Sequence, residues 1–172
     1  MIIDLASVGT TAKRIETEFD PSEIDLESEP VQLRGNTELF GEIVLVDAKA
    51  QLSGTVKAHL VLDCTRCLDV IERDLELPFR AIFVDSSGDD PNVEAEVSED
   101  ALDESLVPDG HVNMAEVVRE QLLLWLPEQI FCRDDCRGLC PKCGANLNLI
   151  DCKCADEDVD PRWAALKSLK KA

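Results

Sequence analysis

The sequence predicts an α+β protein, in which an antiparallel β-meander packs with one or two helices and a small cysteine-rich, metal-binding module follows. Apolar and polar residues alternate with period two between residues 37 and 84, which is typical of half-buried strands. An apolar run with helical spacing begins near residue 113, and six of the eight cysteines lie within 132–154. We therefore expect a β-rich domain over 1–131 and a cysteine-rich module over 132–172.

Composition limits the class of protein. The 172 residues carry 36 acids and 17 bases, a formal charge of −19, and 45% of them are apolar. That apolar share can build a core, so wholesale disorder is excluded. The chain has no apolar run of the ~18 residues that a membrane-spanning helix needs, and its start lacks a secretory signal. We expect a cytoplasmic protein with no membrane partner.

The strands are expected in the first half of the chain. Residues 1–35 mix polar and apolar positions around two acidic clusters, which favours extended or turn structure. Residues 39–46 have the pattern of a strand, with a bulge expected at Gly41. Alternation then predicts strands over 55–64 and 75–83, joined by a hairpin that carries the motif CTRCLD. Successive strands at such short spacing favour an antiparallel meander.

An acidic segment and two helices complete the prediction. Residues 85–109 hold ten acids and no base, so we expect a mobile loop that either attracts a basic partner or is a solvated insertion. A helix is predicted over 113–126, with Asn113 as its N-cap and a proline stopping it. Its apolar residues are expected to pack on the sheet. A second helix is predicted within 161–172.

The cysteines are the strongest functional signal. Nothing in the sequence directs the chain to an oxidising compartment, so metal ligation is favoured over disulfides. CPKCG and CTRC have the CxxC spacing of metal knuckles, and zinc takes four such ligands in a tetrahedron. The more strongly indicated ligands are Cys140, Cys143, Cys152 and Cys154. The less strongly indicated ligands are Cys64, Cys67, Cys132 and Cys136. For the 64/67 pair and for Cys132, buried inert thiols are the alternative.

An iron–sulfur cluster is the second cofactor that these cysteines could bind. Cys136, Cys140 and Cys143 form a CxxxCxxC run, the spacing of radical S-adenosylmethionine enzymes, but the 29 residues after Cys143 are too few for the barrel of such an enzyme. A plain iron–sulfur site uses the same thiolates, so it stays open behind zinc. His59 and His111 join no nucleophile motif, and the sequence has no phosphate-binding glycine loop. We therefore expect a protein that is not an enzyme.

Two motif blocks resemble a known family. CTRCL after an alternating strand, then RGLCPKCGANLN, CKC and DPRWAALKSLK, are similar to the YceD family, described as large ribosomal RNA subunit accumulation proteins. The resemblance covers about residues 36–172. It implies a bacterial protein, with plastid relatives, that is needed for normal accumulation of 23S rRNA. Cys64, Arg66 and Cys67 match the family's CxRC motif. Members with the longer motif match at Cys136, Cys140, Cys143, Gly144, Asn146, Asn148, Cys152 and Cys154. No catalytic residue is implied.

Charge and resemblance together rank the functions. A chain at −19 repels phosphate and attracts basic protein. The leading hypothesis is a non-enzymatic ribosome biogenesis factor that binds a basic large-subunit ribosomal protein or the assembling large subunit. Direct rRNA binding is the first alternative, and a thiol-redox or iron–sulfur protein is the second; DNA is not expected. The candidate binding residues, all in or near the cysteine motifs, are Arg66, Arg137, Asn146 and Asn148.

Overall fold

The computed structural model describes residues 1–26, 31–86, 102–154 and 162. The chain divides into two compact units. The first unit consists of Met1–Asp63 and Val70–Ile130, and the second consists of Cys64–Asp69 and Phe131–Ala172. The division expected after residue 131 placed residues 64–69 in the β-rich domain. In the structure these six residues, which join two strands of the first unit, are grouped with the cysteine-rich unit.

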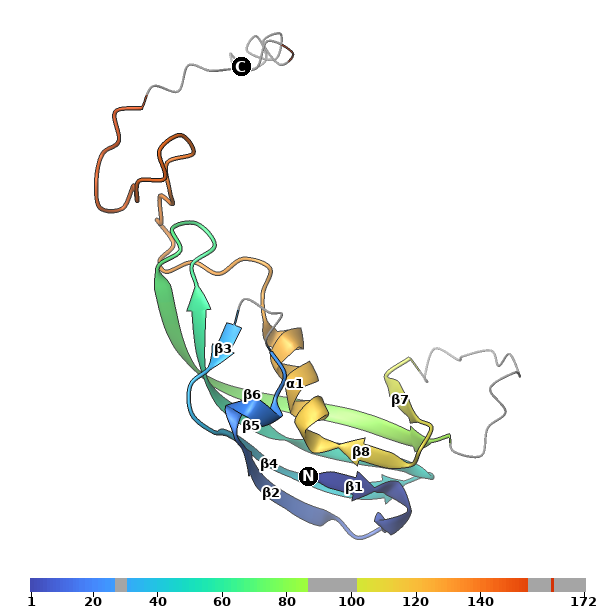
Figure 1. The fold of residues 1–172 in the computed structure, drawn as a ribbon. Coiled ribbons are helices and arrows are strands. Elements are labelled where there is room, and N and C mark those ends of the chain that lie inside the picture. The colour runs from blue at the N-terminus through green and yellow to red at the C-terminus, as the bar shows by residue number, and fades with distance from the viewer. Residues whose placement is uncertain (27–30, 87–101, 155–161, 163–172) are drawn as a thin grey trace. The chain divides into compact units, whose positions relative to one another are not determined.

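The first unit is built on a six-stranded sheet with the path β2-β4-β5-β6-β7, and β3 also pairs with β5 (Figure 1). A separate two-stranded sheet joins β1 to β8. The strands are β1 (Ile2–Asp4), β2 (Lys13–Phe19), β3 (Val31–Leu33), β4 (Thr37–Val46), β5 (Lys49–Asp63), β6 (Val70–Asp85), β7 (Glu104–Val107) and β8 (His111–Asn113). The short 3-10 turns η1 (Leu5–Ser7) and η2 (Pro21–Glu23) follow β1 and β2.

The predicted antiparallel meander is confirmed for β4, β5 and β6, which pair in chain order. The sheet departs from that pattern at β7, which lies parallel to β6. A parallel neighbour requires a long connection, and the chain between Asp85 and Glu104 is long enough to provide one. Residues 104–107 were expected in the acidic loop, but they form this edge strand. Residues 87–101 of that loop, and all of the predicted helix 161–172 except Arg162, lie outside the described residues.

The expected bulge at Gly41 is absent, because β4 and β5 keep an unbroken register in which Gly41 faces Gly54. A Cβ atom on Gly41 would lie 2.6 Å from the carbonyl oxygen of Ser53, and one on Gly54 would meet the carbonyl of Phe40 more closely still. The two backbones therefore approach each other too closely here for a side chain. Glycine serves this close approach, and no residue is inserted in either strand.

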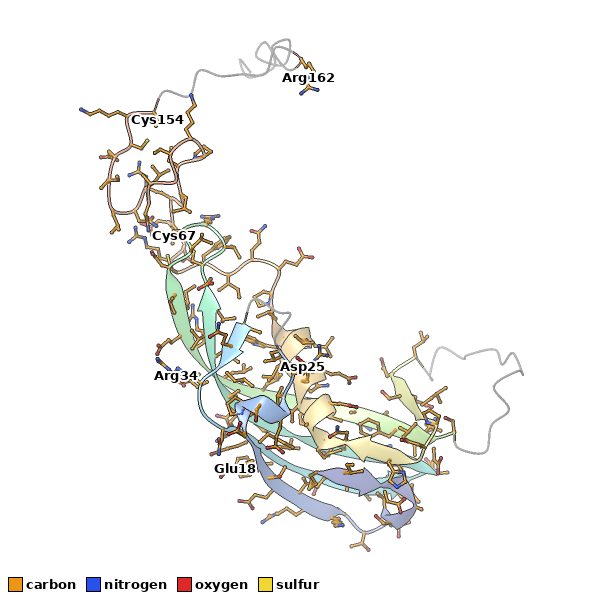
Figure 2. The ribbon with its side chains drawn as sticks, viewed as in Figure 1. Glu18, Asp25, Arg34, Cys67, Cys154 and Arg162 are labelled. Carbon is orange, nitrogen blue, oxygen red and sulfur yellow. The ribbon has the colours of Figure 1, made fainter. Side chains whose placement is uncertain are left out.

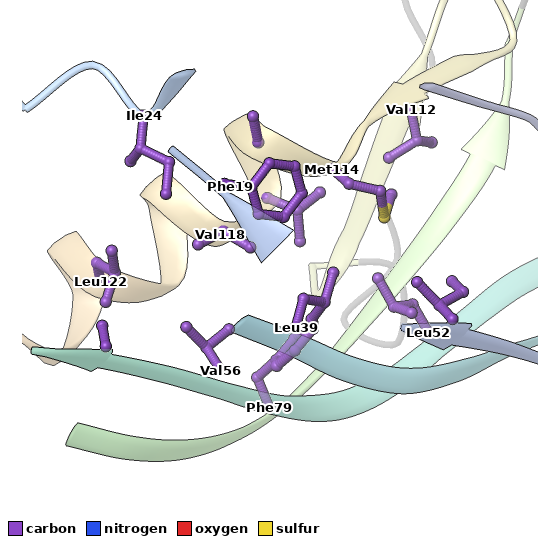
Figure 3. Packing of buried hydrophobic residues seen from close by; sticks show 14 of the residues in the cluster. Phe19, Ile24, Leu39, Leu52, Val56, Phe79, Val112, Met114, Val118 and Leu122 are labelled. Atoms are coloured by element: carbon purple, nitrogen blue, oxygen red, sulfur yellow. The ribbon is translucent and has the colours of Figure 1, made fainter. Parts of the chain in front are cut away.

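The core lies between one face of the sheet and the helix α1 (Met114–Trp125). Figure 3 shows Leu39, Leu52 and Val56 of the sheet beside Met114 and Val118 of the helix. These side chains are fully buried, which contributes about 1.5–3 kcal/mol for each large one. The alternation read from the sequence thus assigns one face of each strand to the core.

The helix starts and ends close to the predicted positions. The Asn113 side chain accepts a hydrogen bond from the Ala115 N–H at 3.1 Å, and the chain becomes extended at Leu126, before Pro127. Trp125 packs at the edge of the core, whereas Leu124 is 79% exposed. The apolar run is longer than the buried face of one helix, so Leu124 projects to solvent. No helix in the described parts of the chain is long and apolar enough to cross a membrane.

Candidate metal centres

The second unit gathers the eight cysteines into two sets of four, and the thiol sulfurs of each set lie within 4.8 Å of one another. The first set is Cys64, Cys67, Cys132 and Cys136. The second set is Cys140, Cys143, Cys152 and Cys154. Figure 2 labels one member of each, Cys67 and Cys154. The sequence ranked Cys140, Cys143, Cys152 and Cys154 as the more strongly indicated ligands and left the pairing of the cysteines open. The CxxxCxxC run is divided between the two sets, because Cys136 belongs to the first set.

The sulfur–sulfur distances fit one tetrahedral ion in each set. Zinc–sulfur bonds of about 2.3 Å in a tetrahedron place neighbouring sulfurs about 3.8 Å apart. The pairs of the first set measure 3.8 Å for Cys64–Cys136 and 3.6 Å for Cys67–Cys132. In the second set, Cys152 lies 3.5 Å from Cys143 and 3.4 Å from Cys140. All eight thiols are free, since a disulfide requires about 2.05 Å. These distances suit a single ion better than a multi-iron cluster, whose thiolates are spread over several irons.

The two CxxC loops have the same backbone geometry. The Leu68 N–H donates to the Cys64 carbonyl at 2.9 Å, and the Gly144 N–H donates to the Cys140 carbonyl at 2.8 Å. Both donors have a positive φ, 60° at Leu68 and 71° at Gly144. A second bond, from the N–H of the first cysteine to the carbonyl five residues later, closes each loop at Asp69 and Ala145. We call these loops the first and the second knuckle.

Each knuckle turns backbone N–H groups toward its first sulfur. Burial raises the pKa of the Cys64 thiol, but N–H groups of the backbone, with that of Cys67 foremost, outweigh burial and lower the pKa to about 6. In the second knuckle the backbone N–H of Cys143 is the main cause that lowers the pKa of Cys140 to about 6. Because the thiolate is the form that binds metal, both knuckles present one sulfur ready for ligation.

Other thiols in the same sets hold their protons more tightly. Burial raises the pKa of the Cys67 thiol, and the hydrogen bond with Cys152 raises the pKa of Cys154 to about 12. Several thiolates this close together repel one another unless a cation lies between them. Binding of a divalent ion therefore has to release protons from each set, which makes metal affinity fall in acid.

The second unit has almost no hydrocarbon core. Among its described residues, the buried apolar positions are all cysteines, namely Cys64, Cys67, Cys136 and Cys140. The cluster of buried aliphatic and aromatic side chains belongs to the first unit. A small unit without such a cluster usually takes its stability from a metal or from disulfides. Since the thiols are free, the arrangement of this unit points to metal.

Asn148 and Arg137 support the first set. The Asn148 amide nitrogen donates to the Cys136 sulfur at 3.3 Å, and this bond lowers the pKa of that thiol. Its amide oxygen accepts from the Arg137 N–H at 2.8 Å. The Arg137 side chain pairs with Asp151 at 2.9 Å on the surface. Asn148 thus orients a candidate ligand, and the Arg137 guanidinium faces a carboxylate.

Asn146 and Asp69 form a second support. The Asn146 amide donates to the Asp69 carboxylate at 3.3 Å, and the same carboxylate accepts from the Cys67 thiol at 3.2 Å. The Asn146 side-chain oxygen accepts from the Asn148 N–H at 2.9 Å. Asp69 was not among the sequence-predicted residues. Its place directly after CTRCL was the available signal, because a polar residue there lies at the closing bond of the knuckle.

Arg66 braces the first knuckle. Its guanidinium lies 3.8 Å from the centre of the Phe131 ring and donates to the Cys136 carbonyl at 3.0 Å. Its carbonyl accepts from the Leu139 N–H at 3.0 Å, and a Cβ on Gly138 would approach that carbonyl to 2.9 Å. The four predicted binding residues therefore all make contacts inside this unit, around its cysteines. Sequence reasoning also missed Phe131, which precedes the first distal cysteine.

The chain thus combines a mostly antiparallel sheet with a unit of two CxxC knuckles, whose two cysteine sets could each hold a metal ion. The chain is a member of the YceD family, whose model, described as "Large ribosomal RNA subunit accumulation protein YceD", matches residues 52–170. All eight cysteines fall within that match. The resemblance seen in the sequence is thus confirmed.

Curated relatives come from bacteria and a plant. An uncharacterized protein of Mycobacterium tuberculosis is 29% identical, over 96% of this chain and 79% of the relative. The uncharacterized protein YlbN of Bacillus subtilis is 28% identical, over 83% of this chain and 75% of its own length. An Arabidopsis thaliana protein named "Large ribosomal RNA subunit accumulation protein YCED homolog 1, chloroplastic" is 23% identical, over 75% of this chain and 47% of its own. No solved structure matches the chain.

Proposed function

We propose that this protein is a non-enzymatic ribosome biogenesis factor of the bacterial cytoplasm that supports accumulation of 23S rRNA and of the large ribosomal subunit. The observation that carries the proposal is the family match, which spans both cysteine sets, most of β5 and all of β6, β7 and α1. The name of the Arabidopsis relative supports the same process. The protein acts by binding a basic ribosomal protein or an assembly intermediate.

Charge supports a basic protein as the partner. The chain carries −19 formal charges, which attract a lysine- and arginine-rich protein over long distances and repel phosphate. Metal loading strengthens this bias in the second unit. Residues 64–69 and 131–154 hold five bases and four acids, so their formal charge is nearly balanced. A divalent ion with four thiolates adds two negative charges at each site, which makes the loaded unit acidic.

We propose zinc as the ion at both sites. Zinc favours four thiolates in a closed tetrahedron and adds no redox chemistry, which suits a structural role in a unit without a hydrocarbon core. Metal analysis of the purified protein is expected to give two zinc ions per chain and no visible absorption. A coloured protein with bound iron would contradict the choice of zinc. Neither result tests the role in rRNA accumulation, which needs its own experiment.

Direct rRNA binding is the second candidate, and the exposed bases around the cysteines favour it. Several of these bases already face acidic or aromatic groups, which weakens the case. Arg133 lies 3.3 Å from Asp135, Arg137 pairs with Asp151, and Arg66 stacks on Phe131. RNA bound through such a surface would dissociate steeply as salt rises.

The proposal is tested in cells and by capture. Depletion of the protein is expected to lower 23S rRNA relative to 16S rRNA, and restored expression is expected to reverse the loss. An unchanged ratio would contradict the proposed function. Tagged protein is then recovered from lysate with and without nuclease, at low and high salt. A basic large-subunit protein that persists after nuclease supports the protein-binding mechanism, whereas rRNA lost with nuclease or salt favours the alternative.

A further inference from the structure

A groove of about 460 Å³ lies along β7, β8 and the first turns of α1, within the first unit. Phe83, Val112 and Val117 are buried side chains that line it, and Val107 lines it from β7. Leu106 also lines the groove and is 67% exposed. The groove therefore combines buried apolar side chains in its lining with an exposed leucine, and exposed apolar surface with a polar rim is typical of surfaces that bind protein.

Carboxylates dominate the charged side chains of the groove. Its lining includes Asp109, Glu116 and Glu120, one imidazole at His111, and no lysine or arginine. Glu116 and Glu120 are exposed, and in the described part of the chain they make no hydrogen bond or ion pair. Glu116 and Glu120 lie four residues apart on α1, and like charges at this spacing destabilise a helix. A cationic ligand in the groove would neutralise both carboxylates and remove this repulsion.

The strand at the side of this groove has a free edge. β7 ends the sheet path and pairs on one side with β6; its other side pairs with no described strand. An edge strand offers backbone N–H and C=O groups that an extended peptide can join. Backbone pairing, an apolar contact and two carboxylates are thus available along the same element.

We propose that this groove binds an extended, lysine- or arginine-rich segment of a protein, added to the edge of β7. This inference rests on the proposed function and names the surface through which a basic partner is held. Alternate side chains of the segment point to one face, so an apolar residue meets Leu106 while neighbouring cations reach Glu116 and Glu120. Nucleic acid is a poor occupant, because its phosphates would meet three carboxylates and a single imidazole, that of His111, and the lining has no lysine or arginine.

A peptide of alternating lysine and valine, eight residues long, is a direct probe for this site. Its binding to the full chain is measured by fluorescence anisotropy at about 150 mM salt, where charges beyond about 8 Å are screened. The double variant Glu116→Gln/Glu120→Gln is expected to bind about tenfold more weakly or worse. The control Glu16→Gln/Glu42→Gln removes the same charge from exposed positions on β2 and β4, and is expected to change affinity by less than about twofold.

The apolar part of the proposal has its own matched pair. Leu106→Ser is expected to weaken binding, whereas Leu102→Ser, at a residue that is 72% exposed and does not line the groove, is expected to leave it unchanged. Both residues are on the surface, so both variants should keep the fold. Equal losses in the two charge pairs, or equal behaviour of the two leucine variants, would overturn the groove as the site. Tighter binding of an RNA oligonucleotide than of the peptide would overturn it as well.

A cellular test separates this inference from the proposed function. The Glu116→Gln/Glu120→Gln protein is expressed in depleted cells, and the 23S to 16S rRNA ratio is measured. Failure to restore the ratio supports the groove. If the variant restores it as well as the native protein, the groove is overturned while the role in rRNA accumulation stands. If depletion itself has no effect, the proposed function fails, and the peptide experiment still decides the groove.

Discussion

Leu68 holds the same position in the first knuckle that Gly144 holds in the second. Each donates its backbone N–H to the carbonyl of the first cysteine of its loop, at 2.9 Å and 2.8 Å, with φ near +60° and +71°. Glycine adopts this left-handed conformation without penalty, but leucine does not. The first knuckle thus keeps a strained residue where the second has the residue best suited to the turn.

This strain predicts the effect of exchanging the two residues. Leu68→Gly removes a side chain that is 63% exposed and relieves the backbone, so metal-loaded protein should gain about 0.5–1 kcal/mol. Gly144→Leu should lose a similar amount, about 1 kcal/mol. The readout is the urea concentration at which metal is released, with Leu149→Gly as a control at an exposed leucine. A less stable Leu68→Gly protein would contradict the argument from strain.

Removal of metal should affect the two units differently. A strong chelator is expected to expose the amides of 131–154 and 64–69 to solvent exchange, because the thiols there replace a hydrocarbon core. Amides of β4, β5 and α1 should keep their protection, since their core contains no cysteine. Hydrogen exchange followed by mass spectrometry measures both. Unchanged protection across 131–154 after complete metal removal would count against the metal sites.

Asn148→Ala tests the support around the first set. It removes the bonds to the Cys136 sulfur and to the Arg137 N–H, so metal affinity at the first site should fall about 10–100-fold. The second site should keep its affinity. Competition with a chromogenic chelator resolves the two sites, and Asn36→Ala on the first unit is the control. Equal weakening of both sites would show that Asn148 acts through the whole unit.

His59 predicts a pH dependence of stability in the first unit. Its hydrogen bond to Asp74, 2.6 Å long, raises the pKa of the imidazole above its ordinary 6.5, and Glu72 adds to this effect. A raised pKa stabilises the fold below about pH 6.5, and that contribution is lost as the pH rises through the folded value. His59→Gln should therefore destabilise the protein more at about pH 5.5 than at about pH 9. Urea unfolding at both pH values measures the difference, and a pH-independent difference would refute the linkage.

The close approach of the backbone at Gly41 and Gly54 predicts that a side chain at Gly54 lowers the stability of the sheet. Gly54→Ala places a Cβ against the Phe40 carbonyl across the strand, so it should cost about 1–3 kcal/mol of unfolding free energy. Gly9→Ala is the matched control, because its added Cβ would meet nothing closer than 4.0 Å. That variant should stay within about 0.5 kcal/mol of the native protein. Urea unfolding followed by circular dichroism compares them.

Local pattern was a good guide wherever one element decides its own structure. Alternation located the strands around Leu39, Val56 and Phe79, since one face of each is buried. Asn113 marked the start of the helix because its side chain caps the first turn. The CxxC spacing identified the two knuckles, because each holds its two sulfurs on one side of a tight turn, but it left open which other cysteines complete each set.

Features that depend on contacts between segments far apart in the sequence could not be predicted from local patterns. Gly41 was expected to mark a bulge, and its real partner, Gly54, is visible only once β4 and β5 are in register. The parallel pairing of β7 depends on how the chain returns to the sheet, which no local pattern encodes. The bond from Asn148 to Cys136 likewise joins residues whose contact is set by the fold of the second unit.

Synthesis of the chain from its N-terminus imposes an order on the assembly of the first set of cysteines. Cys64 and Cys67 leave the ribosome well before Cys132 and Cys136, which supply the other half of their site. At about 5–20 residues per second, the separation of roughly 70 residues means a wait of roughly 3–14 s. During that time the pair is half a binding site on a sheet whose β6 and helix are still being made. The second set, contained within 140–154, completes itself almost as soon as it is synthesised.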